Sequence, residues 1–244
     1  MKLYSGFCNI PRDDKVDDGG DDAWFIASSD VSAIGICDGV GSWRDKGIIA
    51  GVYARSIMRL CEKAFEEKKM KNPLKAIDYA YEGTDEEGST TVVLAKLEAD
   101  RLYYLNLGDS KLAIVREGKI VFTTIPQQHI FNVPYQLGGG NDLPMDGERG
   151  YFTVQKEDII VAATDGLWDN LYIPELLQLL ETSTNPSVLA NNLATEAYKY
   201  SHDEKRWSPR AQQGYELHIY TSDSILSKLG GMPDDITVVV SKVS

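Results

Sequence analysis

Aspartates recur in this sequence where short apolar segments begin or end. Asp38 and Asp165 each follow such a segment, and the pairs at 21–22 and 234–235 each precede one. A carboxylate at the edge of a strand is held by the sheet behind it while it faces open space. If the four places meet at one end of a sheet, two carboxylates about 4 Å apart repel by roughly 4 kcal/mol at an effective dielectric of 20. Such a cluster requires cations.

Oxygen ligands of this kind favour hard divalent ions, magnesium or manganese, over zinc. Few histidines are available to argue for another metal, since the sequence has only His129, His202 and His218. The alternative for each aspartate is a turn or a helix cap, which is what most Asp-Gly and Asp-Asp pairs form. For Asp38-Gly39 taken alone, an ordinary turn is the commoner outcome.

Composition limits the classes of partner. The 244 residues are 43% hydrophobic with a net charge of −12, which argues against nucleic acid or an anionic membrane, because both attract basic surfaces. Three cysteines without a Cys-x-x-Cys spacing indicate neither a disulfide framework nor a zinc site. No apolar run reaches the roughly 20 residues of a membrane span, and the N-terminus has no secretory or mitochondrial-type presequence. We expect a monomeric intracellular protein, in the cytoplasm or in an organelle such as a mitochondrion or plastid.

Helical and strand periods follow one another in blocks along the chain. Residues 48–69 have apolar side chains at the spacing of a long amphipathic helix, and Asn72-Pro73 begins a second helix. From residue 89 the period becomes that of strands separated by turn signals. The expected helices are 48–69, 72–81, 173–181, 186–200 and 208–218, and the expected strands are 23–27, 32–36, 89–97, 101–107, 111–116, 119–123, 151–154, 159–163 and 236–243.

Two segments predict irregular structure. Residues 12–20 are polar and rich in aspartate and glycine. Residues 131–150 contain two prolines, Pro134 and Pro144, and a run of three glycines, which is too many breakers for regular structure. We expect this second segment to be a long surface loop that borders a substrate cleft. No linker divides the chain, so we expect a single domain over residues 1–244.

Six short motifs follow one another in a definite order. They are Asp21-Asp22-Ala23-Trp24, Ile36-Cys37-Asp38-Gly39, Gly88-Ser89-Thr90-Thr91, Asn106-Leu107-Gly108-Asp109-Ser110, Ala163-Thr164-Asp165-Gly166-Leu167-Trp168-Asp169 and Gly231-Met232-Pro233-Asp234-Asp235-Ile236-Thr237. Together they resemble the ordered motifs of the type 2C, metal-dependent serine/threonine protein phosphatases, the PPM family. The segment 38–44, with Gln127-Gln128-His129 later, further resembles the compact subgroup whose better known members are mitochondrial matrix phosphatases.

The resemblance implies an α+β fold, a four-layer α-β-β-α sandwich of two packed antiparallel sheets flanked by helices. It also implies two tightly held Mg²⁺ or Mn²⁺ ions and a third that is held less tightly. Carried over to this sequence, Asp38 bridges the first two ions and the Gly39 carbonyl binds one of them. Asp165 and Asp234 are the implied ligands of the other ion. Asp21 and Asp22 correspond to the acidic pair that holds metal ligands or their waters. Asp109 and Asp169, beside Asp165, are the implied third site.

The implied reaction is hydrolysis of phosphoserine and phosphothreonine in phosphoproteins. Two ions lower the pKa of a shared water, hold it as hydroxide for in-line attack and offset the phosphate charge. A covalent phosphoenzyme is not needed. Asp38, Asp165 and Asp234 are the expected catalytic residues.

Two positions depart from the family pattern. Val40 stands where much of the family has a histidine that protonates the leaving group. Asp17 stands where an arginine usually binds the phosphate. The candidate replacements for substrate binding are Arg12, Lys15, Arg44 and His129.

These candidates have plainer alternatives. His129 could equally be a hydrogen-bonded loop residue, and Arg44 a solvated cation near a helix. The departures leave open a catalytically weak pseudo-phosphatase that binds phosphoproteins as a regulatory module. A phosphatase of the haloacid-dehalogenase type is excluded, because Val40 occupies the position of that motif's second aspartate.

Overall fold

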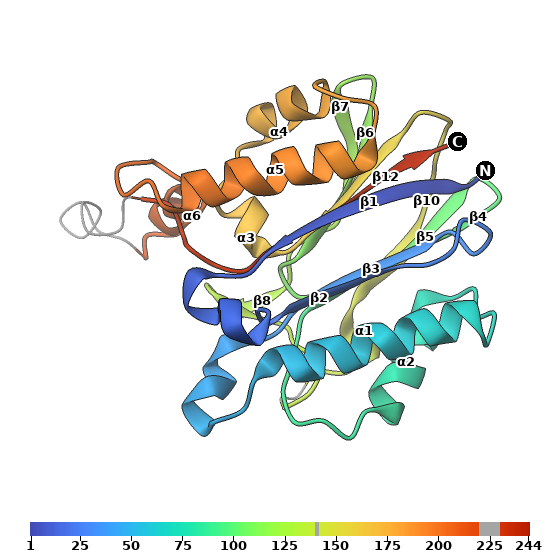
Figure 1. The fold of residues 1–244 in the computed structure, drawn as a ribbon, viewed down its shortest axis with the longest axis horizontal. Helices are drawn as coiled ribbons and strands as arrows, with labels where there is room; N and C mark the ends of the chain where they lie inside the picture. The colour runs from blue at the N-terminus through green and yellow to red at the C-terminus, as the bar shows by residue number, and fades with distance from the viewer. Residues whose placement is uncertain (140–141, 220–229) are drawn as a thin grey trace.

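Two five-stranded antiparallel sheets pack face to face in the described part of the chain, residues 1–139, 142–219 and 230–244 (Figure 1). This computed structural model has one pair of helices outside one sheet and a group of helices outside the other. The four layers confirm the expected α-β-β-α sandwich. No helix in these residues is long and apolar enough to cross a membrane.

The first sheet has the strand order β1-β12-β11-β6-β7. Its central strand is β11, and β12 pairs with β1 on one side and with β11 on the other. The N-terminal and C-terminal strands therefore lie side by side, and both chain ends are at the same edge of the molecule (Figure 1). The strands are β1 (Leu3–Ile10), β6 (Lys111–Arg116), β7 (Lys119–Thr123), β11 (Ile159–Ala163) and β12 (Ile236–Val243).

The second sheet has the order β10-β5-β4-β3-β2 and places two acidic strand ends beside each other. In the register of β2 and β3, Asp22 is paired with Asp38. The strands are β2 (Asp22–Ile26), β3 (Ala33–Asp38), β4 (Val92–Glu98), β5 (Arg101–Leu107) and β10 (Glu148–Thr153). A separate small hairpin joins β8 (Gln128–Ile130) to β9 (Val133–Pro134).

The helices bury apolar faces against the two sheets. Helix α1 (Ala50–Glu66) and helix α2 (Pro73–Gly83) cover the second sheet, and Asn72 caps α2 by accepting a hydrogen bond from the amide of Leu74. Helix α5 (Pro186–Ser201) lies along β1 and β12 of the first sheet. The remaining helices are α3 (Asp165–Trp168), α4 (Ile173–Leu180) and α6 (Pro209–Glu216), with short 3₁₀ turns at Asp13–Asp18, Gly41–Lys46 and Pro144–Asp146.

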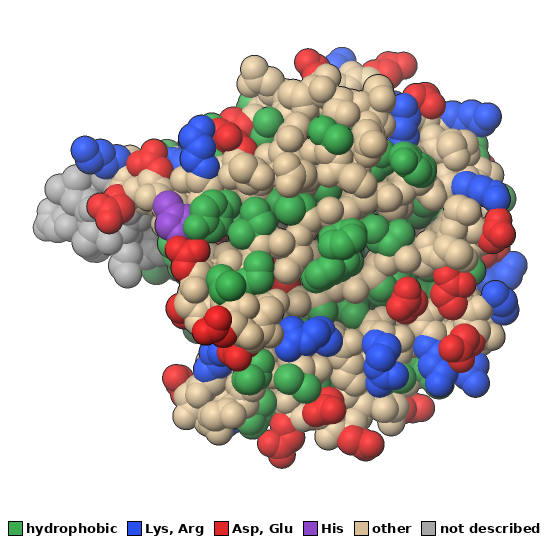
Figure 2. All heavy atoms as spheres, viewed as in Figure 1, with side chains coloured by type: hydrophobic (Ala, Val, Ile, Leu, Met, Phe, Trp, Pro, Cys, Tyr) green, Lys and Arg blue, Asp and Glu red, His purple; other side chains and the backbone are tan. Residues whose placement is uncertain are grey.

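Three apolar clusters hold these layers together. One lies between the sheets and includes Ile36, Ile114 and Val239. The other two lie between each sheet and its helices. Figure 2 shows hydrophobic side chains in a band between the two helical layers, along the edge where β1 and β2 lie side by side. At this edge the rings of Phe7 and Trp24 are 4.7 Å apart between centroids.

The structure corrects three expectations about local structure. Strand β1 was not expected, because its apolar and polar residues do not alternate strictly; it forms because β12 pairs with it over its full length. Segment 12–20 contains a 3₁₀ helix rather than only loop. Segment 131–150 is not wholly irregular, since it contains β9, a 3₁₀ turn and the start of β10, and Gly140 lies outside the described residues.

Candidate metal centre

The acidic strand ends of both sheets meet at one end of the sandwich. Asp22 and Asp38 come from the paired strands β2 and β3. Asp165 begins α3 directly after β11 of the other sheet. The hydroxyl of Thr164 donates a hydrogen bond of 2.9 Å to Asp22 Oδ2, which ties the two sheets together at this point. Aspartates from both sheets thus lie together at this end of the sandwich.

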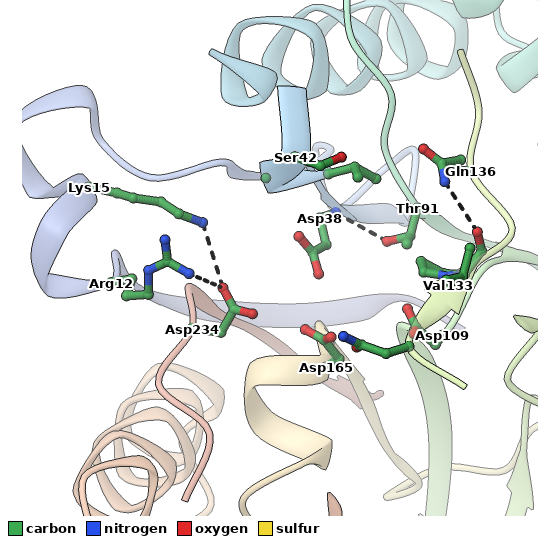
Figure 3. Close-up of a pocket in the computed structure, with 15 residues that line it drawn as sticks. Arg12, Lys15, Asp38, Ser42, Thr91, Asp109, Val133, Gln136, Asp165 and Asp234 are labelled. Atoms are coloured by element: carbon green, nitrogen blue, oxygen red, sulfur yellow. Dashed lines mark hydrogen bonds and ion pairs between the residues drawn. The ribbon is translucent and has the colours of Figure 1, made fainter. Parts of the chain in front are cut away.

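A cavity of about 380 Å³ opens between these strand ends (Figure 3). Its acidic lining residues are Asp38, Asp109, Asp165 and Asp234. In Figure 3 the carboxylates of Asp38, Asp165 and Asp234 point into the same space. The cavity therefore collects oxygen ligands from β3, from the start of α3 and from the loop before β12.

Gly39 also lines this cavity and keeps the backbone close to Asp21. Its amide donates to the Asp21 carbonyl oxygen at 3.1 Å. A Cβ atom at this position would lie 2.6 Å from that same oxygen, which is too close. Any side chain would displace the backbone that presents Asp38, so the glycine is required by close approach.

The clustered carboxylates resist ionisation. Burial, and after it the charge of Asp165, raises the pKa of Asp38 well above its usual range. Burial, followed by the charge of Asp234, does the same to the pKa of Asp165. Burial also raises the pKa of Asp22. The group can carry its full negative charge only when cations are supplied.

The donor set fits a hard divalent ion. Asp22 Oδ1 and Asp165 Oδ1 are buried and have no hydrogen-bond partner among the described residues, which is unusual for carboxylate oxygens. All the acidic lining groups offer oxygen, the ligand preferred by magnesium and manganese. In the described residues, no three acidic, histidine or cysteine side chains already converge on one point as a ligand set. Water would therefore have to complete any coordination shell here.

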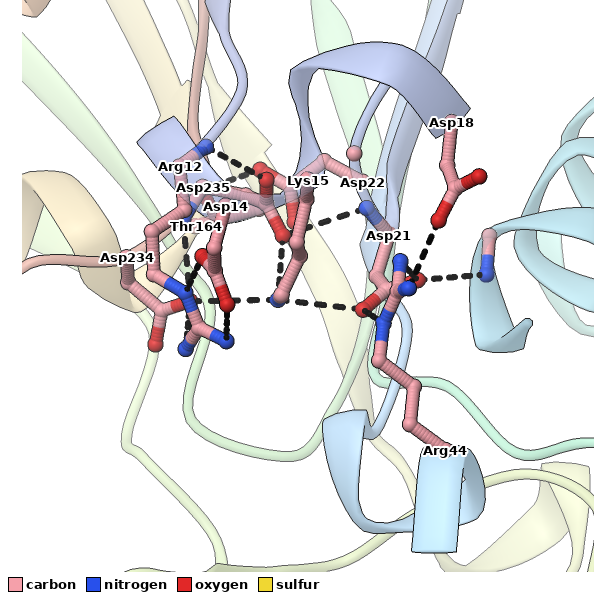
Figure 4. Close-up of polar contacts among 12 residues, drawn as sticks. Arg12, Asp14, Lys15, Asp18, Asp21, Asp22, Arg44, Thr164, Asp234 and Asp235 are labelled. Atoms are coloured by element: carbon pink, nitrogen blue, oxygen red, sulfur yellow. Dashed lines mark hydrogen bonds and ion pairs between the residues drawn. The ribbon is translucent and has the colours of Figure 1, made fainter. Parts of the chain in front are cut away.

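Two cations hold the acidic residues behind the cavity (Figure 4). Lys15 Nζ lies 2.6 Å from Asp235 Oδ2, 3.0 Å from Asp21 Oδ2 and 3.6 Å from Asp234 Oδ1. Arg44 binds both oxygens of Asp21, at 2.9 and 3.1 Å. Asp21 is thus held by internal ion pairs, whereas Asp22 faces Thr164.

These contacts set the protonation states of Asp21 and Lys15. Burial alone would raise the pKa of Asp21, but the Arg44 hydrogen bond and the Lys15 charge keep it below its ordinary value. Burial alone would lower the pKa of Lys15, but Asp235 and its neighbours raise it above the ordinary value. Lys15 is therefore a permanent positive charge at neutral pH, buried behind the carboxylates.

The four candidate substrate-binding residues separate into two groups. Arg12 and Lys15 line the cavity, and Arg12 Nη1 lies 3.9 Å from Asp234 Oδ1. Arg44 and His129 lie outside the lining that the described residues form. His129 Nε2 lies 3.0 Å from both carboxylate oxygens of Asp142, and its ring stacks on Tyr135. The structure thus gives His129 the plainer role, a hydrogen-bonded residue of its loop.

For other residues that line the cavity, the sequence predicted the segment but not the individual side chains. Asn132, Val133 and Gln136 belong to the segment expected to border a cleft, and they do line this cavity. Thr164 was visible only as a neighbour of Asp165, and its contact with Asp22 depends on the packing of two sheets. Asp109 and Asp169 lie around a second, smaller cavity beside the first.

Comparisons with known proteins agree with this geometry. The family model described as Stage II sporulation protein E (SpoIIE) matches residues 28–244. Probable protein phosphatase 2C 80 of Arabidopsis thaliana is 38% identical over 257 residues, covering 100% of this chain and 59% of the relative. The X-ray structure of the photosystem II phosphatase PBCP superposes with a TM-score of 0.94 at 29% identity, covering 99% of each chain.

A more distant structure shares the fold alone. The catalytic domain of the serine threonine protein phosphatase PstP, crystallised with two manganese ions, superposes with a TM-score of 0.67 at 17% identity over 100% of this chain and 99% of that one. The chain belongs to the type 2C, or PPM, family of metal-dependent protein phosphatases. It spans 59% of the length of the Arabidopsis relative.

Proposed function

We propose that this protein is a magnesium- or manganese-dependent phosphatase that hydrolyses phosphoserine and phosphothreonine in phosphoproteins. The observation that carries the proposal is the meeting of Asp38, Asp165 and Asp234 in one cavity, from three separate elements. Buried carboxylate oxygens without a hydrogen-bond partner among the described residues, and the raised pKa values of Asp38 and Asp165, support a site suited to cations. Membership of the PPM family supports the reaction type.

Within this proposal, Asp38 would serve both ions and the Gly39 carbonyl would hold one of them. Asp165 and Asp234 would hold the other. Two bound divalent ions would supply a water of lowered pKa as the nucleophile and would offset the charge of the phosphate. The buried oxygen of Asp22 would hold a ligand water, while Asp21 stays with Arg44 and Lys15 and fixes the backbone under the site.

The phosphate of the substrate needs a cation that can reach it. Arg12 lines the cavity and its side chain is 34% exposed. Its Nε and Nη2 donate to the exposed Asp14, and its Nη1 lies 3.9 Å from Asp234 at the rim. Lys15 is 3% exposed and already shared among carboxylates. We therefore assign phosphate binding to Arg12 and the fixing of the acidic residues to Lys15. Arginine suits this role because its planar guanidinium can form two hydrogen bonds to a phosphate.

Among the described residues, no histidine lines this cavity. Val40 lines the wall next to Asp38, and His129 is held by Asp142 away from it. Protonation of a serine or threonine alkoxide would then come from water or from a more distant group. Aryl phosphates leave as weakly basic phenolates and need less of this help.

Hydrolysis assays with two substrates test the proposal. We expect a phosphothreonine peptide and an aryl phosphate to be hydrolysed with manganese, and neither with a chelator. Asp165→Asn, which removes a ligand, should abolish both activities. Hydrolysis that persists in chelator would contradict metal dependence, and binding of the phosphopeptide without turnover would favour the pseudo-phosphatase alternative.

The natural substrate and compartment are a further part of the proposal. The close superposition on a photosystem II phosphatase supports a plastid location and a photosystem II phosphoprotein as substrate. Dephosphorylation of isolated photosystem II cores, compared with an unrelated phosphoprotein at equal concentration, tests this choice. Equal rates on both would count against it.

A further inference from the structure

A second cavity, of about 180 Å³, lies beside the candidate metal centre. It shares Asp109 and Asp165 with the first cavity, and its third carboxylate is Asp169. The resemblance to the PPM family places a weaker third metal ion at Asp109 and Asp169. The side chains around this cavity are arranged differently from what such an ion requires.

Both carboxylates of the expected third site already have partners. Gln128 Nε2 donates to Asp109 Oδ2 at 2.7 Å. Arg210 Nη1 lies 3.0 Å from Asp169 Oδ2. Lys111, whose Nζ lies 5.0 Å from the centre of the Trp168 ring, lines the same cavity. One oxygen of each carboxylate that a third ion would use is therefore already bound by a side chain of the protein.

Arg210 is built into this position. Only 5% of the residue is exposed. Its backbone amide donates to the Asp169 carbonyl at 3.2 Å, and the guanidinium carbon lies 4.4 Å from the centre of the Phe131 ring. Ser208 caps the helix that starts here, since its hydroxyl accepts from the Ala211 amide at 3.1 Å. The backbone and the side chain of Arg210 are thus both tied to the site.

The charges around the cavity are already nearly balanced. Among the described residues there, three carboxylates, Asp109, Asp165 and Asp169, face two cations, Lys111 and Arg210. An arginine side chain keeps its proton in proteins, so this cation cannot be neutralised to make room. A divalent ion entering beside it would meet a like charge at short range.

We propose that Arg210, together with Lys111, takes the place of a third metal ion, so that the chain binds two divalent ions rather than three. This inference rests on the proposed two-ion phosphatase centre and refines it. Arg210 is a positioning residue in this account. Its guanidinium holds the carboxylate of Asp169, which a third ion would otherwise bind.

Counting bound manganese on the full chain tests the proposal, by calorimetric titration and by native mass spectrometry. We expect two ions on the natural sequence and three on Arg210→Met, which removes the charge and keeps an unbranched side chain. Adding Asp169→Asn to Arg210→Met should return the count to two. Arg206→Met is the matched control, because Arg206 also pairs with a carboxylate, Glu175, and also has a buried Nε without a hydrogen-bond partner among the described residues.

Two results would overturn the inference. One is an Arg210→Met protein that folds and still binds two ions. The other is a natural chain that binds three ions and loses one in Asp169→Asn, a test that stands even if Arg210→Met does not fold. The ions of the proposed function are those lost in Asp38→Asn, so failure of that proposal is distinguishable from failure of this one.

Discussion

Replacing Asp38 by asparagine should make the metal-free protein more stable while it removes metal binding. The change deletes a charge that faces Asp165 and Asp22, and burial and those neighbours raise the pKa of Asp38. Two carboxylates about 4 Å apart repel by roughly 4 kcal/mol at an effective dielectric of 20. A shared proton relieves most of this, and asparagine removes what remains. For a chain of this size, each gain of about 1 kcal/mol raises the melting temperature by about 2–4 °C, so a rise of a few degrees is expected.

Thermal melting at pH 7.5, in chelator and in manganese, measures both effects. The natural protein should gain stability from manganese, because ions that bind only the native state stabilise it. Asp38→Asn should melt higher in chelator and show little further rise with manganese. Asp158→Asn is the control: Asp158 is buried and paired with Arg116 away from the cavity, so its loss should lower the melting temperature and leave the manganese response intact. An Asp38→Asn protein that melts lower in chelator, or that keeps the full manganese response, would refute the reasoning.

Three further predictions follow from the same contacts. Lys15→Met leaves Asp21 and Asp235 buried without their shared cation, so the free energy of unfolding should fall by about 3–5 kcal/mol; an unchanged urea midpoint would argue against this role. Val40→His adds an imidazole beside the site, and general acid catalysis contributes about 10² to 10⁴ in rate. Turnover of phosphothreonine peptides should therefore rise while aryl phosphate turnover changes little. Equal changes in both turnover rates would exclude an acid role for this histidine. Burial first, opposed in part by Arg210, raises the pKa of Asp169 to about 6. The folded state then binds a proton more tightly than the unfolded state, so the metal-free protein should lose stability as pH rises from 4 through 6, and melting in chelator across that range would show the opposite trend if this is wrong.

Much of the fold could be predicted because its signals are local. The strands Arg101–Leu107, Lys111–Arg116 and Lys119–Thr123 have the bounds expected from their apolar runs and the turns between them. Helix α1 (Ala50–Glu66) is shorter than the expected 48–69 at both ends, because helix ends are less well marked in the sequence than the apolar face between them. Strand β1 could not be predicted in this way, since its pairing with β12 joins the two ends of the chain.

In the candidate site, too, the local features could be predicted and the long-range contacts could not. The positions of Asp38 and Asp165 follow from the strands they end, and a strand end is a local property. The pairing of Lys15 with Asp235 joins residues 220 positions apart, and nothing in either neighbourhood indicates it. The same holds for Arg210 and Asp169, which meet because α6 packs beside α3. Such contacts decide which acids are free for a metal, so they require the structure.

The surroundings of His129 could not be predicted from its neighbours in the sequence. The sequence left a catalytic role and a hydrogen-bonded loop role open, and in the structure the ring contacts Asp142 and Tyr135. The residues that face the cavity are instead Asn132 and Gln136, a few positions later. The expectation that segment 131–150 borders the cleft agrees with this lining, whereas His129 lies outside it.

The central claim is that two divalent ions in the cavity of Asp38, Asp165 and Asp234 hydrolyse phosphoserine and phosphothreonine. The most direct test measures, in one titration of the metal-free protein, the manganese bound per chain by mass spectrometry and the rate of phosphate release from a phosphothreonine peptide. The account predicts that the rate rises with occupancy of the second ion and that Asp38→Asn loses both ions and the activity. Full activity with a single ion, or release of phosphate from the peptide by the metal-free protein, would contradict it.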